Sequence, residues 1–383
     1  MSKSNQLAKL DQSGKPYIIY KSQTGFDLFT NFSKKIVLNN KNIQSFLKKK
    51  NKKKIKNTDL YIGFFGYELL NNLIDIKLPK QKDLNFPKGI FYKPEKKIKL
   101  SNNFNHFERD FKSGSFKINI NKKSYTKIFN RFKKKIKSGE TYQIKICTKY
   151  KTKSKIDPLD FFSRLSKTNL APEAFMIKDK NYSIVSCSPE NLITKKGSEI
   201  STKPIAGTVK KTKNLNKSKA LNYFRKNLKE TKEHNMIVDM ERNDLSRICK
   251  IGTVKLSKEK IVEEYKDLFH YVSLIKGKLR KNINNMDIIK AMMPGGSVIG
   301  CPKINTLNLL NNQEKENRNI YTGSFGYIKF NGDMRFNIII RSILNFKNIS
   351  EISVASGVVV DSNANHEFNE NFLKAKALID LFK

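Results

Sequence analysis

The stretch Met293-Pro-Gly-Gly-Ser-Val-Ile-Gly-Cys-Pro-Lys303 combines a glycine-rich turn with the start of a helix. Pro302 is well placed as the first helical residue, and a helix N-terminus can present amide groups to an anion. A plain helix cap explains the same residues without a ligand. The stretch is not a P-loop, because Cys-Pro separates Gly300 from Lys303 and no Gly-Lys-Ser/Thr follows. It predicts a tight turn, then a helix, at a candidate anion site.

Composition favours a folded protein that stays in the cytoplasm. The chain has 383 residues, 38% of them hydrophobic, with 26 Phe and 14 Tyr, which is enough to bury a substantial core. No apolar run approaches the ~20 residues of a membrane helix, and the first residues contain no apolar secretory segment. The four cysteines are scattered without CxxC spacing, which is typical of reduced thiols. We therefore expect a cytoplasmic protein that does not bind membranes.

The formal net charge of +42 raises the hypothesis of a nucleic-acid-binding protein. The densest cluster is the lysine-rich run Lys48–Lys56, but lysines are spread along the whole chain. The run has no interleaved aromatic residues on which bases could stack, so a solvated loop explains it better. We expect no nucleic-acid partner, although such a charge attracts anionic substrates.

The order of predicted elements indicates an α+β fold. Strands come in hairpins and meanders between helices, so we expect antiparallel-rich sheets packed on each other with helices outside. Residues 1–115 form a weakly patterned N-terminal region, and residues 116–383 form the main domain. Helical spacing predicts helices at Lys122–Ser138 and, as one long helix, Lys217–Asp244. Asn331-Gly332 predicts a hairpin between strands at Gly323–Phe330 and Asp333–Ser342.

Several charged residues fall on faces that are predicted to be buried or grouped. Glu233 shares a helix face with apolar residues, where an unpaired carboxylate is costly. Glu367, Glu370 and Lys374 form one stripe on the last helix. Two carboxylates from distant helices would suit Mg²⁺ beside an anionic substrate. A salt bridge to a lysine explains Glu233 equally well, and a stripe like that on the last helix is more often a solvated face. Arg341 lies among isoleucines and is either a carboxylate partner or a strand-edge residue.

A series of short motifs resembles the chorismate-utilising enzymes, the family of anthranilate synthase and aminodeoxychorismate synthase large subunits. The resemblance covers roughly residues 116–383, in the family's order, and Gly63–Glu68 resembles its N-terminal region. The motifs are Ser188-Pro-Glu190, Pro204-Ile-Ala-Gly-Thr208, Glu233-His-x-Met-x-Val-Asp239, Arg242-Asn-Asp244, His270-x-Val-Ser273, Pro294-Gly-Gly-Ser297, Gly300-x-Pro-Lys303, Tyr321-x-Gly-x-x-Gly-Tyr327, Asn337-x-x-x-Arg341 and Ser356-Gly-Val358.

The resemblance implies chorismate as substrate and Mg²⁺ as cofactor. Glu233 and Glu370 would hold Mg²⁺ against the ring carboxylate, and Glu367 would border the metal. Glu190 would be the general acid for loss of the ring hydroxyl, and His270 would contact the reacting end of the ring. The residues implied to line or bind the substrate are Gly207, Thr208, Tyr321, Arg341, Gly357 and Lys374.

Within the family, the sequence favours amination of chorismate to 4-amino-4-deoxychorismate, for 4-aminobenzoate and folate synthesis. Relatives that add water have a lysine base where this chain has Gln143, so ammonia is the expected nucleophile. No glutaminase segment is present, so a separate glutaminase subunit is the expected partner. Pro294-Gly-Gly-Ser297 and the absence of a Leu-Leu-Glu-Ser element point the same way.

Two substitutions depart from the pattern of the aminating enzymes. Ala206 stands where many of those that make the para product have a nucleophilic lysine, so anthranilate synthase is the alternative. Arg335 stands where the family usually has Asp.

Overall fold

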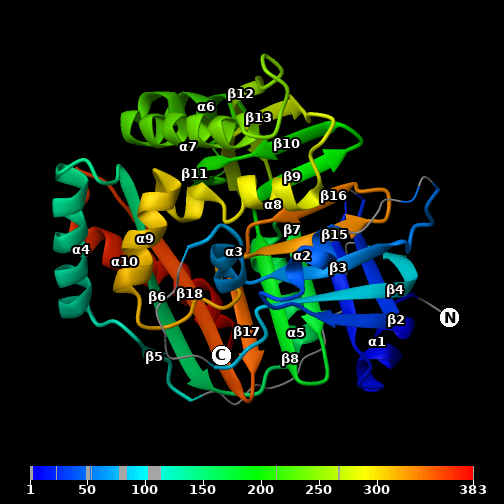
Figure 1. Cartoon of the computed structure of the whole chain (residues 1–383). Helices are drawn as coiled ribbons and strands as arrows, with labels where there is room; N and C mark the ends of the chain where they lie inside the picture. Colours follow the sequence, from blue (N-terminus) through cyan, green and yellow to red (C-terminus); the bar gives the residue numbers. More distant parts are fainter. Residues whose placement is uncertain are drawn as a thin grey trace.

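The computed structural model describes residues 3–22, 24–48, 52, 54–76, 84–101, 114–212, 214–265 and 268–382. In these ranges the strands join into one 18-stranded sheet, and all of its ladders are antiparallel. Helices lie on the outside of the curled sheet (Figure 1). The predicted α+β class with antiparallel strands is therefore confirmed.

The N-terminal part supplies four strands and three helices to this sheet. The strands are β1 Tyr17–Lys21, β2 Phe26–Val37, β3 Leu60–Phe65 and β4 Gly89–Leu100, and the helices are α1 Lys3–Gln12, α2 Ile43–Leu47 and α3 Tyr67–Leu73. Strand β1 pairs with β7, and β3 pairs with β15. The first strands are thus hydrogen-bonded directly to strands of the later chain. The predicted division into residues 1–115 and 116–383 stays a prediction.

The rest of the chain supplies the other strands and the helices that carry the candidate site. The strands are β5 Lys117–Ile118, β6 Gln143–Lys153, β7 Glu173–Lys178, β8 Tyr182–Ser188, β9 Asn191–Lys196, β10 Glu199–Lys203, β11 Ile205–Lys210, β12 Lys255–Glu264, β13 Leu268–Lys278, β14 Gly300–Cys301, β15 Ser324–Lys329, β16 Met334–Asn337, β17 Ser342–Phe346 and β18 Ile349–Val358. The helices are α4 Lys122–Lys137, α5 Pro158–Asn169, α6 Lys217–Lys226, α7 Leu228–Ser246, α8 Asn285–Met292, α9 Lys303–Gln313 and α10 Ala364–Ile379, with 3-10 turns η1 Gly296–Val298 and η2 Asp380–Phe382.

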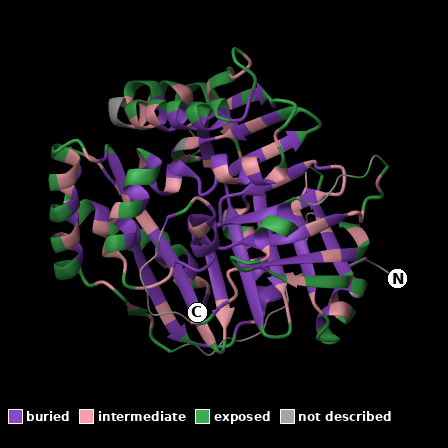
Figure 2. Cartoon of the chain, viewed as in Figure 1, coloured by how far each residue is buried: buried purple, intermediate pink, exposed green. Residues whose placement is uncertain are grey.

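The core shows how the sheet folds onto itself. One buried cluster contains residues of strands and loops only. Within it the rings of Phe175 on β7 and Phe325 on β15 stack with centroids 3.8 Å apart, although these two strands are not hydrogen-bonded neighbours. Helices cover other faces; for example, Phe161 and Phe162 of α5 pack into a second cluster with Leu378 of α10. The central strands are buried, whereas α4 and α6 turn exposed faces outward (Figure 2).

Two sequence-based predictions of elements are wrong. The helix predicted at Lys217–Asp244 is two helices, because Asn227 is extended and its side chain caps α7 by accepting from the amide of Glu230. The strand predicted at Asp333–Ser342 ends at Asn337, and a new strand starts at Ser342, because β16 pairs with β9 and β17 with β8.

Other predictions are confirmed. Helix α4 follows the predicted range almost to the residue. Strands β15 and β16 pair as the hairpin predicted at Asn331-Gly332. Of the lysine-rich run Lys48–Lys56, residues 49–51 and 53 lie outside the described residues.

Candidate functional site

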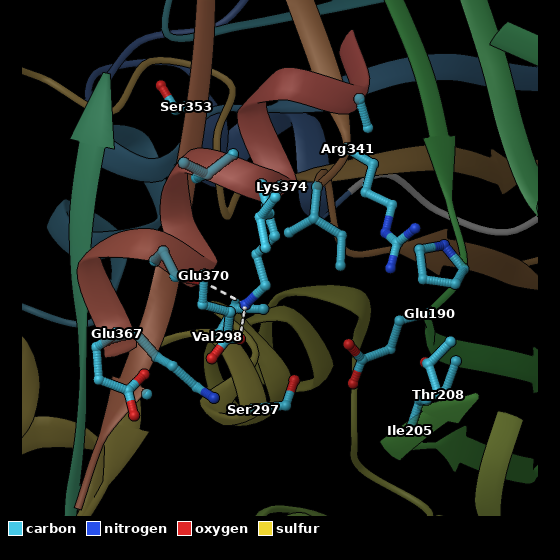
Figure 3. A pocket seen from close by; sticks show the side chains of 18 of the residues that line it. Glu190, Ile205, Thr208, Ser297, Val298, Arg341, Ser353, Glu367, Glu370 and Lys374 are labelled. Carbon is cyan, nitrogen blue, oxygen red and sulfur yellow. Dashed lines mark hydrogen bonds and ion pairs between the residues drawn. The ribbon is translucent and has the colours of Figure 1, made fainter. Parts of the chain in front are cut away.

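A cavity of about 730 Å³ lies between the sheet and helices α7 and α10. Eight of the ten predicted site residues line it, namely Glu190, Thr208, Glu233, Tyr321, Arg341, Gly357, Glu370 and Lys374. Figure 3 shows several of them converging on the same space from different elements. The other two, Gly207 and His270, are not among its lining residues. The structure therefore brings most of the predicted site residues to one cavity, and their roles stay predictions.

Glu190 follows β8 and is 5% exposed. Its Oε1 has no hydrogen-bond partner among the described residues. Burial raises the pKa of this carboxyl to about 7, and Ser297, Lys145 and the Ile205 amide offset the effect only in part. Glu190 therefore holds a proton in the cavity near neutral pH, as a general acid must.

Arg341 lies at the break between β16 and β17, where its φ is +49°. This left-handed conformation is uncommon outside glycine. It directs the guanidinium into the cavity on the side of Glu190 (Figure 3). Among the described residues no carboxylate lies within salt-bridge distance of Arg341. A lone guanidinium in a cavity is suited to bind the carboxylate of a ligand in a bidentate manner.

Thr208 and His270 face each other across strands β11 and β13. The Thr208 hydroxyl lies 2.8 Å from Nδ1 of His270. Burial, assisted by the charge of Arg341, lowers the pKa of His270 to about 4, so the imidazole is neutral at pH 7. Of these two residues, only Thr208 lines the cavity. His270 therefore contacts the cavity indirectly, through its hydrogen bond with the Thr208 hydroxyl.

Close packing against Phe224 and Glu230 requires a glycine at position 207. A Cβ at this position would approach Cε1 of Phe224 to 2.5 Å and would collide with Glu230. The glycine therefore lets β11 lie close to helices α6 and α7, which keeps Glu230 at the cavity wall. The side chain of Ala206 lies outside the described residues.

The side of the cavity opposite Arg341 is rich in carboxylates. Helix α7 contributes Glu230 and Glu233, one turn apart, and α10 contributes Glu367 and Glu370. Ligand atoms of His366, Glu367 and Glu370 all lie within 4.8 Å of one another. Carboxylate oxygens are the donors that Mg²⁺ prefers, so these residues fit a hard divalent cation.

Two donors from strand β6 hold Glu233. The side-chain amide of Gln143 donates to Glu233 Oε1 at 2.7 Å, and the ammonium of Lys145 donates to the same oxygen at 3.1 Å. Burial by itself lowers the pKa of Lys145, but the Glu233 carboxylate, assisted by Glu370, raises it above its ordinary value. Lys145 is therefore a charged ammonium at neutral pH.

Gly357 makes room for this arrangement. It pairs with Lys145 in the β18–β6 ladder. A Cβ on residue 357 would lie 2.7 Å from both the Gln143 amide nitrogen and the Lys145 ammonium. The glycine thus explains how two donors converge on Glu233.

Tyr321 rests on a buried arginine that the sequence did not single out. Arg318 is 1% exposed and its guanidinium carbon lies 4.7 Å from the ring centroid of Tyr67 and 6.0 Å from that of Tyr321. It also donates to both carboxylate oxygens of Glu314 and, at 3.2 Å, to the carbonyl of Lys145. Arg318 therefore ties the turn before Tyr321 to strand β6.

The glycine-rich stretch shapes the cavity floor. Ser297 and Val298 line the cavity, whereas the start of α9 does not. Lys303 instead forms a buried ion pair with Asp244 of α7 and donates to the carbonyl of Ala291 at 3.2 Å. This part of the stretch is therefore a structural clamp, and the anion-binding interpretation of the helix start is not supported.

Arg335 forms an ion pair that the sequence did not predict. Its guanidinium binds the buried carboxylate of Glu173 on β7, a strand that is not paired with β16, and the Tyr20 hydroxyl donates to the same carboxylate at 2.5 Å. The pair lies away from the lining of the cavity.

Periodicity could have identified three site residues that the sequence analysis missed. Glu230 precedes Glu233 by one helical turn, and His366 precedes Glu370 by one turn, which places each pair on one helix face. Lys145 follows Gln143 by two residues, on the same face of strand β6.

Comparison with known proteins agrees with this geometry. The chain matches the family model of chorismate binding enzymes over residues 10–380. It is 34% identical to aminodeoxychorismate synthase component 1 of Bacillus subtilis over 267 residues, which cover 70% of this chain and 57% of that protein. It is 32% identical to an anthranilate synthase component I-like protein of Synechocystis over 351 residues, which cover 83% of this chain and 72% of that protein. The chain thus spans little more than half the length of the Bacillus protein.

A solved structure supports the fold. Anthranilate synthase component I from Streptococcus pneumoniae superposes with a TM-score of 0.77 at 24% identity, covering 95% of this chain and 92% of that chain. In the described part of the chain, no helix is both long enough and apolar enough to cross a membrane.

Proposed function

This chain belongs to the family of chorismate binding enzymes, and on that premise we propose that it aminates chorismate with ammonia to give 4-amino-4-deoxychorismate. The product would serve the synthesis of 4-aminobenzoate and folate. A separate glutaminase subunit would supply the ammonia, and the name "component 1" of the Bacillus relative fits such a partner.

The presence of Arg341 and Glu190 in the lining of one cavity carries this proposal. Chorismate has two carboxylates and a ring hydroxyl that must leave. Arg341 has no carboxylate partner among the described side chains and can take the enolpyruvyl carboxylate, with Tyr321 beside it. Glu190, which is protonated near neutral pH, would then face the ring.

The chain's own groups account for the proton transfers. Glu190 gives its proton to the ring hydroxyl, the C–O bond breaks, and water leaves. Ammonia forms the new C–N bond and loses a proton, which the carboxylate of Glu190 can take back. Thr208, held by the neutral ring of His270, donates or accepts a hydrogen bond next to the reacting atoms.

Gln143 and Lys145 favour ammonia over water as the nucleophile. A glutamine amide cannot deprotonate water. Lys145 is close by, but the neighbouring carboxylates keep it charged, so it is not a free base. Ammonia needs no such base before it attacks.

Mg²⁺ fits the carboxylate side of the cavity, and Glu233 and Glu370 would hold it. The bound ion would supply Lewis-acid polarisation and a template for the ring carboxylate. Lys374, which pairs with Glu370 at 2.6 Å, and the backbone of Gly357 would border that carboxylate.

Anthranilate synthesis is the alternative. Ala206 cannot form the covalent adduct of a lysine, and a curated relative from Arthrobacter globiformis, 36% identical over 263 residues, is an anthranilate synthase component 1. The sequence Pro294-Gly-Gly-Ser297 favours the para product.

Product analysis tests the proposal. Purified protein is incubated with chorismate, Mg²⁺ and ammonium, and a lyase that releases 4-aminobenzoate is added to half of the sample. We expect lyase-dependent 4-aminobenzoate. Anthranilate and pyruvate as the only products would support anthranilate synthesis instead. Unchanged chorismate would refute both proposed reactions.

A further inference from the structure

Lys145 contacts one of the two carboxylate oxygens of Glu233, the proposed metal ligand. Its ammonium lies 3.1 Å from Glu233 Oε1, and the Lys145 and Glu233 side chains are 16% and 26% exposed. The ion pair of Glu370 is more exposed to solvent. Its partner Lys374 lies one turn along the same helix, and both side chains are about 40% exposed. A solvent-exposed pair of this type contributes little. Lys145 is therefore the stronger competitor for the proposed metal site.

An ammonium and a divalent cation compete for the same oxygen of Glu233. Mg²⁺ binds carboxylate oxygens at about 2.0–2.1 Å. An ion at that distance from Oε1 would lie next to the Lys145 ammonium, where like charges repel strongly in a partly buried site. Lys145 therefore opposes the binding of a divalent ion at Glu233 for as long as it keeps this contact.

The cavity gives Lys145 somewhere to go. Gly357 faces it across the β18–β6 ladder and leaves the space in front of the ammonium free of a Cβ. Lys145 itself lines the cavity, so its long side chain can swing toward an anion bound there. The strand that carries it is fixed, because Arg318 binds the Lys145 carbonyl.

We propose that Lys145 is a built-in counter-cation that holds Glu233 in the resting protein and leaves it when the carboxylate of a bound substrate offers a new partner. The inference rests on the proposed function, because it takes Glu233 as a metal ligand and a dianion as substrate. Divalent ion and substrate then raise each other's affinity by the same factor, as linkage requires. Lys145 is a positioning residue in this scheme and takes no part in bond making.

Binding of Mn²⁺ in place of Mg²⁺, followed by electron paramagnetic resonance on the full chain, tests the inference without turnover. Lys145→Met and Lys145→Gln both remove the charge, and Lys145→Arg keeps it. Lys153→Met is the matched control, because Lys153 is exposed at the far end of the same strand. Circular dichroism checks the fold of each variant.

Without substrate, the two neutral variants are expected to bind Mn²⁺ at least about tenfold more tightly than wild type, which corresponds to about 1.4 kcal/mol. The arginine variant and the Lys153 control should stay within about twofold of wild type. Chorismate, added without ammonium, should tighten Mn²⁺ binding in wild type and much less in the neutral variants. Equal Mn²⁺ affinities in wild type and both neutral variants would overturn the role of Lys145.

Failure of the proposed function looks different. If Glu233→Gln binds Mn²⁺ as wild type does, the metal site itself is wrong. If Mn²⁺ binds tightly to the neutral variants but chorismate changes the Mn²⁺ affinity of no variant, the competition of Lys145 with the metal is supported and the assignment of chorismate as the substrate is refuted.

Discussion

Replacing Glu190 by glutamine is expected to slow the reaction and to stabilise the protein above neutral pH. The two effects have one cause. Burial raises the pKa of Glu190 from the ordinary 4.5 to about 7, which keeps the catalytic proton in place but makes ionisation costly in the folded state.

The sign and size of the stability effect follow from linkage. Between pH 4.5 and 7 the folded protein keeps the Glu190 proton, whereas the unfolded chain has lost it. The stability from the raised pKa is thus complete below pH 4.5 and is lost as pH rises through 7. The loss amounts to about 1.4 kcal/mol per pH unit, or about 3 kcal/mol in all. Glutamine does not ionise, so Glu190→Gln should match wild type near pH 4.5 and exceed it by up to about 3 kcal/mol at pH 8.

The rate should respond in the opposite direction. With a pKa near 7, about one tenth of the Glu190 side chains remain protonated at pH 8, so the wild-type rate should fall roughly tenfold per pH unit above neutrality. Loss of a general acid typically costs 10²- to 10⁴-fold, and the variant should show a flat profile there. Titration of His270 cannot cause the fall in rate above pH 7, because the pKa of His270 lies at about 4.

The assay pairs urea denaturation at pH 5, 6, 7 and 8 with initial rates at the same pH values. The concentration of free ammonia is held constant, so that its own protonation does not enter the profile. Glu190→Asp serves as the comparison that retains an acid. A variant with wild-type rates and a wild-type pH profile would refute the assignment of Glu190 as the acid. An unchanged difference in stability between pH 5 and 8 would refute the raised pKa.

Three further substitutions probe other parts of the site. Gly357→Ala places a Cβ 2.7 Å from both donors that hold Glu233; kcat/KM should fall by at least about tenfold with little change in thermal unfolding, and wild-type kinetics would contradict this packing. Arg341→Lys loses the planar fork, so KM for chorismate should rise about tenfold while kcat changes less, as steady-state kinetics would show. Arg318→Met removes the buried guanidinium that holds Glu314, and urea denaturation should show a loss of about 3 kcal/mol.

Helical periodicity predicted the carboxylate side of the site well, because its spacing is local. On α10 the positions of Glu367, Glu370 and Lys374 fix a common stripe whatever the helix packs against. The same reasoning places Glu233 on one face of α7 but does not reveal that Asn227 ends the preceding helix. That break depends on a cap, in which the Asn227 side chain accepts from the amide of Glu230.

Strand partners could not be predicted in the same way, because they depend on residues far apart in the chain. The apolar residues around Arg341 predict one continuous strand. In the fold the chain changes partners there, from β9 to β8, and Arg341 takes a left-handed conformation that aims it into the cavity. The role of Gly357 likewise follows from the β18–β6 register, which puts it opposite Lys145.

If the proposed function is right, Glu190 and Lys145 are both held in states that the reaction must change. The raised pKa of Glu190 keeps a proton for the proposed leaving hydroxyl, and the stability that it contributes is lost as pH rises from 4.5 through 7. Lys145 holds Glu233 in the structure, and in the proposed scheme this contact opposes the binding of a divalent ion there. Were the Lys145 contact absent, the clustered carboxylates of α7 and α10 would repel one another or capture an ion before any substrate arrived. A dianionic substrate would relieve that conflict in the proposed scheme, because its carboxylate would replace Glu233 as the partner of Lys145, and the ion and the substrate would then depend on each other.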